Sequence, residues 1–116
     1  MKLAIVGTRN PSVTYQEWEK LLLDKINPND VKLVISGGAM GVDTFAKLFA
    51  CSHRIPYMEF SPQYALYGRY ATVRRNTQIV EEASTVIAFP SAYSKGTFHS
   101  IKEAHRLGRQ AIVVNL

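Results

Sequence analysis

The sequence predicts an α/β fold, a Rossmann-like three-layer sandwich in which helices cover a five-stranded parallel sheet. Short apolar runs rich in β-branched residues alternate with amphipathic segments along the whole chain, and this alternation is typical of parallel sheets. The length of 116 residues, with 47% hydrophobic and 20% charged residues, is that of one globular domain over residues 1–116. Loops rich in small residues follow several of the apolar runs.

The expected strands and helices follow from local patterns. Strands are predicted at residues 2–6, 31–36, 56–60, 84–89 and 110–114. A helix begins after Thr14, which forms a capping box with Glu17, and the Asn27-Pro28-Asn29 turn ends it. Further helices are expected from the loop at 37–41 to about residue 53, from about residue 71 to 83, and at 96–107, with a tyrosine-rich loop at 61–70.

The positive charge of the chain falls in the loops that follow the strands. The formal net charge is +5. The segments 7–16, 36–43, 61–76 and 90–100 contain four of these five net charges, because Asp43 is their only acid and their basic residues are Arg9, Arg69, Arg74, Arg75 and Lys95. Ligands of parallel α/β sheets bind beyond the carboxyl ends of the strands. The charge distribution therefore predicts an anion site at this edge.

Three of these loops have the composition of phosphate-binding turns. Glycine lets the backbone approach a ligand closely, and the N–H groups at a helix start attract anions. Each turn taken alone has a second interpretation, in which it only connects a strand tightly to a helix. The candidate ligand-binding residues of the three loops are Gly7, Thr8, Arg9, Ser36, Gly37, Gly38, Ala39, Met40, Gly41, Asp43, Pro90, Ser94, Lys95, Gly96 and Thr97. Asp43 is expected either to cap its helix, to bind ribose hydroxyls or to serve as a catalytic carboxylate.

Residues before and within the third helix complete the candidate site. Adjacent helical residues point about 100° apart, so only one of Arg74 and Arg75 can face the ligand, and we expect Arg75 to do so with Asn76. Tyr64, Tyr67 and Tyr70 are spaced by three residues. They either pack on the core or supply a ring that stacks on a base, for which Tyr67 is the candidate.

Taken together, residues 35–43, Arg75-Asn76 and residues 94–97 resemble the SLOG superfamily of Rossmann-like nucleotide-binding domains. With Gly7-Thr8-Arg9, the chain most resembles the small stand-alone YspA/YpsA-related branch, and it is similar to the core of DNA-processing protein A. The resemblance covers about residues 2–115. It implies the strand order 3-2-1-4-5, a ligand site over the first, second and fourth strands, and nucleotide-derived ligands such as ADP-ribose-type signals.

The leading hypothesis is a sensor or sequestering module for a nucleotide-derived small molecule, with no cofactor and no metal. The first alternative is a phosphoribohydrolase or other N-glycosidic hydrolase with Asp43 as its catalytic carboxylate. The LONELY GUY enzymes of the superfamily carry Pro-Gly-Gly-x-Gly-Thr-x-x-Glu, whereas Ser100 stands here at the glutamate position. The second alternative is a module that binds single-stranded nucleic acid, as the likeness to DNA-processing protein A implies.

The remaining expectations concern the cellular compartment of the protein, its single cysteine and its oligomeric state. We expect a cytoplasmic protein, because no apolar run is long enough to span a membrane and no signal-peptide pattern is present. Cys51 is interpreted as a small core residue. Apolar residues at 45–49 are a candidate surface for a homodimer or higher oligomer, because stand-alone relatives commonly self-associate.

Overall fold

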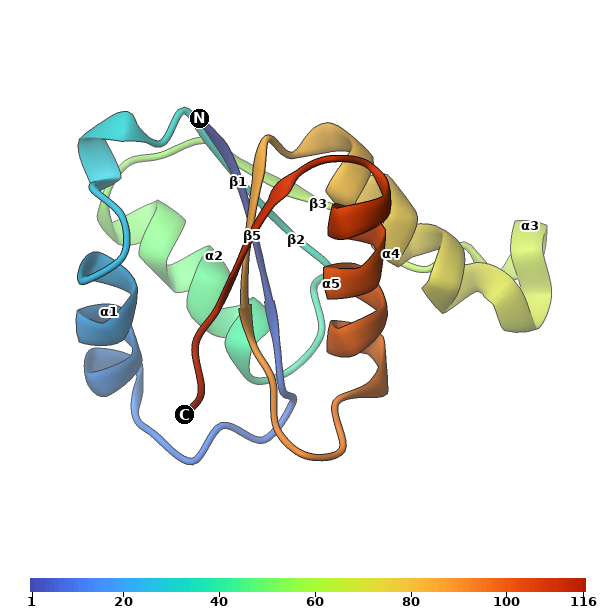
Figure 1. Ribbon diagram of the computed structural model, residues 1–116, viewed down its shortest axis with the longest axis horizontal. Coiled ribbons are helices and arrows are strands. Elements are labelled where there is room, and N and C mark those ends of the chain that lie inside the picture. The colour runs from blue at the N-terminus through green and yellow to red at the C-terminus, as the bar shows by residue number, and fades with distance from the viewer.

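A computed structural model describes residues 1–116 and shows a parallel sheet with helices on both faces (Figure 1). The five strands are β1 (Lys2–Gly7), β2 (Leu33–Ser36), β3 (Tyr57–Glu59), β4 (Thr85–Phe89) and β5 (Gln110–Val113). Their order in the sheet is β3-β2-β1-β4-β5, and every pair is parallel. The predicted fold class and strand order are therefore confirmed.

The helices complete the alternation that the sequence predicts. The α-helices are α1 (Tyr15–Leu23), α2 (Val42–Ser52), α3 (Tyr64–Tyr67), α4 (Ala71–Glu82) and α5 (Lys95–Arg106), and two 3-10 turns lie at Pro28–Asp30 and Gly68–Tyr70. The capping box at Thr14 is present: the Glu17 N–H donates to the Thr14 hydroxyl, and the Glu17 carboxylate accepts from the Thr14 N–H. It satisfies two backbone donors that an uncapped helix start would leave open.

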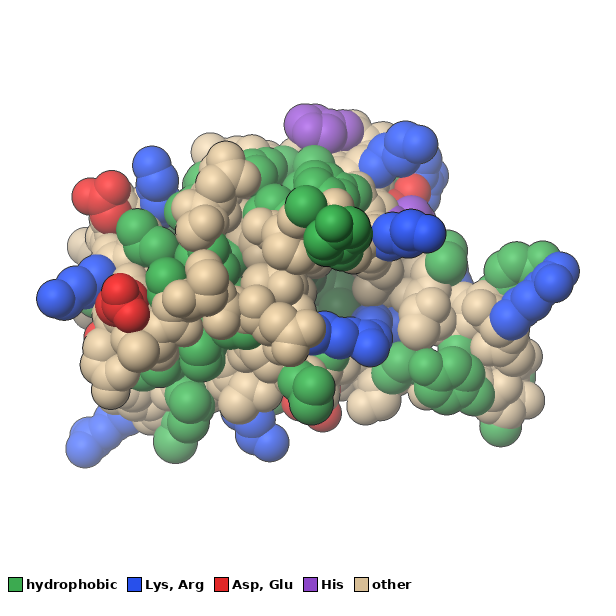
Figure 2. Space-filling model, turned by 90° about the horizontal axis from the view of Figure 1, so that it is seen from below, with side chains coloured by type: hydrophobic (Ala, Val, Ile, Leu, Met, Phe, Trp, Pro, Cys, Tyr) green, Lys and Arg blue, Asp and Glu red, His purple; other side chains and the backbone are tan.

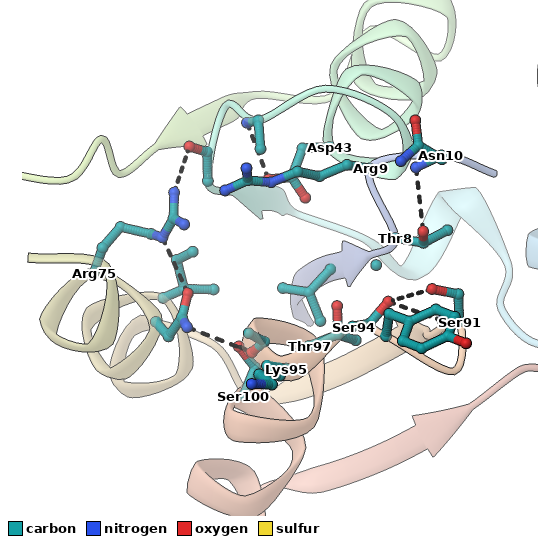
Figure 3. A pocket seen from close by; sticks show the side chains of 18 residues that line it. Thr8, Arg9, Asn10, Asp43, Arg75, Ser91, Ser94, Lys95, Thr97 and Ser100 are labelled. Atoms are coloured by element: carbon teal, nitrogen blue, oxygen red, sulfur yellow. Dashed lines mark hydrogen bonds between the residues drawn. The ribbon is translucent and has the colours of Figure 1, made fainter.

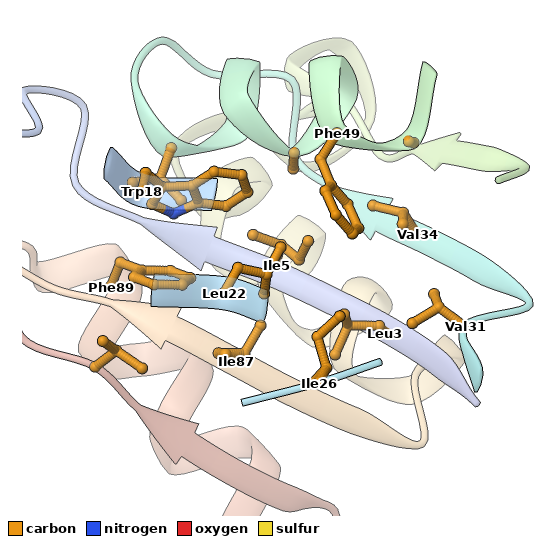
Figure 4. Packing of buried hydrophobic residues seen from close by; sticks show 14 residues of the cluster. Leu3, Ile5, Trp18, Leu22, Ile26, Val31, Val34, Phe49, Ile87 and Phe89 are labelled. Atoms are coloured by element: carbon orange, nitrogen blue, oxygen red, sulfur yellow. The ribbon is translucent and has the colours of Figure 1, made fainter. Parts of the chain in front are cut away.

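Two apolar clusters hold the layers together, one on each face of the sheet. On the first face Trp18, Leu22 and Phe49 from α1 and α2 pack on Ile5 and Phe89 (Figure 4). The second cluster joins α4 and α5 to the other face of the sheet, through Ala4, Val6, Ile35, Ile79, Val80, Ala83, Val86, Ala88 and Ala104. Successive strand residues point to opposite faces, and so the central strands are apolar throughout.

The structure corrects three local expectations. The segment 61–70 is not an open loop, because it contains α3 and the turn Gly68–Tyr70. Cys51 is exposed rather than part of the core, because the inward face of α2 at this level is occupied by Phe49 and Ala50. Within residues 45–49, Phe49 is fully buried and Phe45 packs against Trp18, whereas Leu48 is 49% exposed, so only part of the apolar stretch faces solvent.

This arrangement brings the loops after β1, β2 and β4 to one edge of the sheet. Helix α3 extends sideways from this edge, beyond α4, and gives the molecule a projecting arm (Figure 1). No helix combines the length and the apolar character needed to cross a membrane.

Candidate functional site

A cleft of about 590 Å³ opens at the carboxyl ends of the strands, and we call it the main cleft. Figure 2 views this edge and shows a hollow bordered by basic side chains. Arg9, Arg75 and Lys95 line the cleft, and Asp43 is its only acid. Arg69 and Arg74 line neither this cleft nor the second one described below. Three of the five loop cations are therefore gathered in one place.

Arg75 and Asn76 form a polar bridge across the main cleft. Arg75 is only 8% exposed, and its Nη1 donates to the Gly37 carbonyl at 2.9 Å. Its Nε donates to Asn76 Oδ1 at 3.0 Å, and Asn76 Nδ2 reaches the Gly96 carbonyl at 3.4 Å. The dipeptide thus joins the loop after β2 to the start of α5. A guanidinium has five N–H donors, so Arg75 keeps three for a ligand.

Arg74, the preceding residue, points elsewhere. Its guanidinium lies 3.9 Å from the Glu81 carboxylate and 5.9 Å from the centre of the Tyr67 ring. Figure 3 shows Arg75 and Arg9 extending toward one another across the cleft. Burial lowers the pKa of Arg75, and the nearby charge of Arg9 acts in the same direction, whereas Asp43 opposes both. A bound anion between the two guanidinium groups would relieve their repulsion.

Asp43 lies opposite Arg75, with Gly37 between them. A Cβ atom on Gly37 would lie 2.6 Å from Arg75 Nη1 and 3.0 Å from Asp43 Oδ2, so only glycine leaves room for both side chains. Asp43 Oδ2 accepts from the Ala39 N–H at 3.1 Å. Burial raises the pKa of Asp43, while the Ala39 N–H and the charge of Arg75 act to lower it. Asp43 therefore places its own acidic group in the first turn of α2, which reduces the attraction of this helix start for an anion.

The start of α5 offers an anion site that the protein leaves open. No acid lies in the first turn of α5 and no side chain caps it. The N–H of Lys95 donates to Tyr93 and that of Phe98 to Ser94, but those of Gly96 and Thr97 have no partner in the protein. Both residues line the main cleft beside Lys95. Free N–H groups, a helix dipole and an ammonium group together favour a phosphate at this position.

A second hollow of about 390 Å³, the side cleft, adjoins the main cleft on the side of α3. The two clefts share Arg9, Gly37, Ala39 and Arg75. The rest of the side cleft is mainly apolar or small, and its further residues are Gly38, Met40, Ser61, Pro62, Tyr64 and Thr72. The clefts are neighbours at the carboxyl edge of the sheet, and we refer to the two together as the groove.

Most of the residues that the sequence nominates meet in this groove. The main cleft contains Gly7, Thr8, Arg9, Gly37, Ala39, Asp43, Arg75, Asn76, Ser94, Lys95, Gly96 and Thr97, and the side cleft adds Gly38 and Met40. Four nominated residues line neither cleft, namely Ser36, Gly41, Tyr67 and Pro90. Ser36 is fully buried under the loop, and Gly41 packs against the backbone of Thr8 and Arg9.

The lining residues that sequence reasoning missed are Val6, Asn10, Ile79, Ser91, Tyr93 and Ser100 in the main cleft and Ser61, Pro62 and Thr72 in the side cleft. Tyr64, one of the three tyrosines that the sequence offered for stacking, also lines the side cleft. Ser91 lies in the loop after β4, where its N–H and its hydroxyl both contact the Ser94 hydroxyl at 2.9 Å. The Ser-x-x-Ser spacing is a signal for such a turn. Ser100 donates its hydroxyl to the Gly96 carbonyl at 3.2 Å, which shapes the start of α5.

Comparison with known proteins places this fold and groove in a family. The model of the family described as DNA recombination-mediator protein A matches residues 1–60, more than half of the chain. The chain belongs to this family. The match includes β1, β2, the start of α2 and the loops that carry Arg9, Gly37 and Asp43. The resemblance to small SLOG-type Rossmann-like proteins is thereby confirmed.

Individual family relatives agree with this assignment. Gene 61 protein of Mycobacterium phage D29 is 30% identical in an alignment of length 114, and the match covers 92% of this chain and 90% of that protein. Two structures of DNA processing protein A share the fold over 97% of the chain. The TM-score is 0.72 at 19% identity for the protein from Helicobacter pylori and 0.78 at 18% identity for that from Streptococcus pneumoniae. The chain spans 64% and 49% of those two structures.

Proposed function

We propose that this protein binds single-stranded DNA along the groove formed by the main and side clefts. The observation that carries the proposal is that the two clefts adjoin at Arg9 and Arg75, which line both of them. A groove with cations at its middle and an open, partly apolar extension fits a chain of nucleotides, in which phosphates alternate with bases. The Helicobacter pylori relative is described as binding single-stranded DNA, and its likeness supports the same ligand class here.

Each part of a nucleotide has a chemical counterpart in the groove. The N–H groups of Gly96 and Thr97 and the ammonium of Lys95 suit one phosphate, and the Arg9–Arg75 pair suits the next. Asp43 and Asn76 supply acceptors and donors for base edges. A duplex would keep its bases stacked inside, whereas an unpaired strand can turn them toward the protein.

The test is fluorescence anisotropy with a labelled oligothymidine of about 15 nucleotides, measured between about 50 and 200 mM salt. We expect binding that weakens with salt, by about 0.7 log units per log unit of salt for each phosphate contacted. The variants Arg9→Ala and Lys95→Ala should each bind more weakly and each lose about 0.7 from that slope, because each removes one phosphate contact. Both residues are exposed, so the fold should not change.

Lys32→Ala is the matched control, because Lys32 is exposed and precedes β2, at the opposite edge of the sheet. It removes the same charge without touching the groove, and its slope should equal that of the wild type. Absence of oligothymidine binding, or an equal effect of Lys32→Ala and Lys95→Ala, would reject DNA binding in the groove. Stronger binding to a duplex of the same length would reject the preference for a single strand.

A nucleotide-derived small molecule is the second candidate, and the shape of the main cleft favours it. Its volume of about 590 Å³ lies within the range of small-molecule sites, and polar groups from three loops and from the helices α2, α4 and α5 converge in it. Calorimetric titration with ADP-ribose, cyclic nucleotides and mononucleotides decides between the candidates. Tight binding of one of these compounds without oligothymidine binding would favour the small molecule.

A further inference from the structure

The side cleft differs from the main cleft in the kind of group that it can hold. Its cations, Arg9 and Arg75, lie at the end that it shares with the main cleft. Its other end is built from Met40, Pro62 and Tyr64, with no charged side chain among its lining residues. A ligand that enters from the main cleft therefore passes from a cationic to an apolar environment.

Two large apolar side chains of this end are open to solvent. Met40 is 67% exposed and Tyr64 is 62% exposed, although both line the same hollow. They come from different elements, Met40 from the loop before α2 and Tyr64 from the first position of α3. Exposed apolar groups that border one cleft are typical of a binding surface rather than of a core. Tyr64 is also close enough to Arg75 to influence the pKa of the guanidinium.

An acid beside Gly38 makes the apolar end a poor site for a phosphate. The Glu59 carboxylate lies against the backbone of Gly38, at a position where a Cβ on that glycine would be 2.5 Å away. Its Oε1 accepts the Tyr57 hydroxyl at 2.9 Å. Negative charge beside Gly38 repels a phosphate but tolerates a neutral, aromatic group. The occupant that fits is therefore an unpaired base whose phosphate stays between Arg9 and Arg75.

We propose that Met40 and Tyr64 form a stacking subsite for the base of the nucleotide adjacent to the one in the main cleft. This inference rests on the proposed binding of single-stranded DNA and adds a second nucleotide position to it. A thioether and a phenol ring both make favourable contacts with aromatic faces. Stacking recognises any base, so the subsite adds affinity for a strand without adding sequence preference.

The experiment compares protein variants on two ligands by anisotropy. The ligands are an oligothymidine of about 15 nucleotides and an abasic strand of the same length, which keeps every phosphate and lacks every base. Tyr64→Ala should bind oligothymidine about 5- to 100-fold more weakly than the wild type, the range typical of one lost base–aromatic stack. Its affinity for the abasic strand should equal that of the wild type. Tyr64→Phe should restore binding of oligothymidine, and Met40→Ala should weaken it in the same way as Tyr64→Ala.

Tyr70→Ala is the control, because Tyr70 is 60% exposed on the same arm and lines neither cleft. Equal effects of Tyr64→Ala and Tyr70→Ala would overturn the stacking subsite, and so would an equal loss on both ligands. Circular dichroism checks that each variant is folded. If the wild type binds no oligothymidine, the proposed function fails together with the subsite. If it binds and Tyr64→Ala binds equally well, only the subsite fails.

Discussion

The start of α2 packs against the loop that carries Thr8 and Arg9, and Gly41 makes this contact possible. The Val42 N–H donates to the Thr8 carbonyl at 3.1 Å. Gly41 has a φ of +78°. A Cβ atom there would lie 2.4 Å from the Thr8 carbonyl oxygen and 2.5 Å from that of Arg9. Gly41→Ala therefore combines an unfavourable backbone conformation with a collision against backbone atoms that cannot rotate away.

The expected loss of stability follows from these two terms. A left-handed conformation costs an alanine about 1 to 2 kcal/mol. Forcing a methyl group into closely packed atoms costs about 1 to 3 kcal/mol more. The total is about 2 to 5 kcal/mol. At about 2.1 cal/mol/K of unfolding entropy per residue, the chain loses about 4 °C in Tm for each kcal/mol, so Gly41→Ala should lower Tm by about 8 to 20 °C.

The assay is thermal unfolding followed by circular dichroism, with Gly108→Ala as the control. Gly108 has a φ of +70°, but beyond its chain neighbours no atom lies within 4 Å of the position that a Cβ atom would take there. Gly108→Ala therefore has only the cost of the unfavourable backbone conformation, and its Tm should fall by about 4 to 8 °C. Equal shifts in the two variants would refute the argument that close approach at Gly41 holds the loop with Thr8 and Arg9.

Two further predictions concern Asp43 and Thr14. Burial raises the pKa of Asp43. The protonated carboxyl group therefore contributes its whole stabilisation below about pH 4, and this stabilisation is lost as pH rises through the raised pKa. Asp43→Asn keeps an acceptor for the Ala39 N–H but cannot ionise. In urea unfolding, its stability relative to the wild type should therefore increase between about pH 4 and 7. A stability difference that does not vary with pH would contradict this. Thr14→Ala removes the capping box of α1 and should lower the free energy of unfolding by about 1 kcal/mol. In the thermal assay this corresponds to a Tm lower by about 4 °C. An unchanged Tm would show that the cap contributes nothing.

The strands and long helices could be predicted because their signals are local. The apolar run at Thr85–Phe89 is buried at every position, and Thr14 and Glu17 mark a helix start within four residues. Alternation of such elements predicted a parallel sheet covered by helices, whereas the order of its strands was predicted from the resemblance to SLOG proteins. The prediction that Cys51 lies in the core was wrong because it needed information that is not local. The run before Cys51 is apolar, but the side of α2 that faces the sheet depends on packing with α1 and the strands.

Within the candidate site, the sequence by itself determined which loops carry the positive charge and that these loops share one edge of the sheet. Only the tertiary structure decided how their residues meet. The Arg75–Asn76 bridge joins Gly37 to Gly96, contacts that span 38 and 20 residues of sequence. The projection of α3 brings Tyr64, rather than Tyr67, to the groove, because Tyr67 faces Arg74 instead.

The two glycine turns illustrate the physical reason for this division. Both precede a helix and look alike in sequence, yet Arg75 and the backbone of Thr8 contact the turn before α2, while the N–H groups of Gly96 and Thr97 stay free at the start of α5. Local sequence sets the conformation of a turn through its glycines and its caps. Whether the turn is open to a ligand depends on which distant groups fold against it, and those contacts exist only in the packed chain.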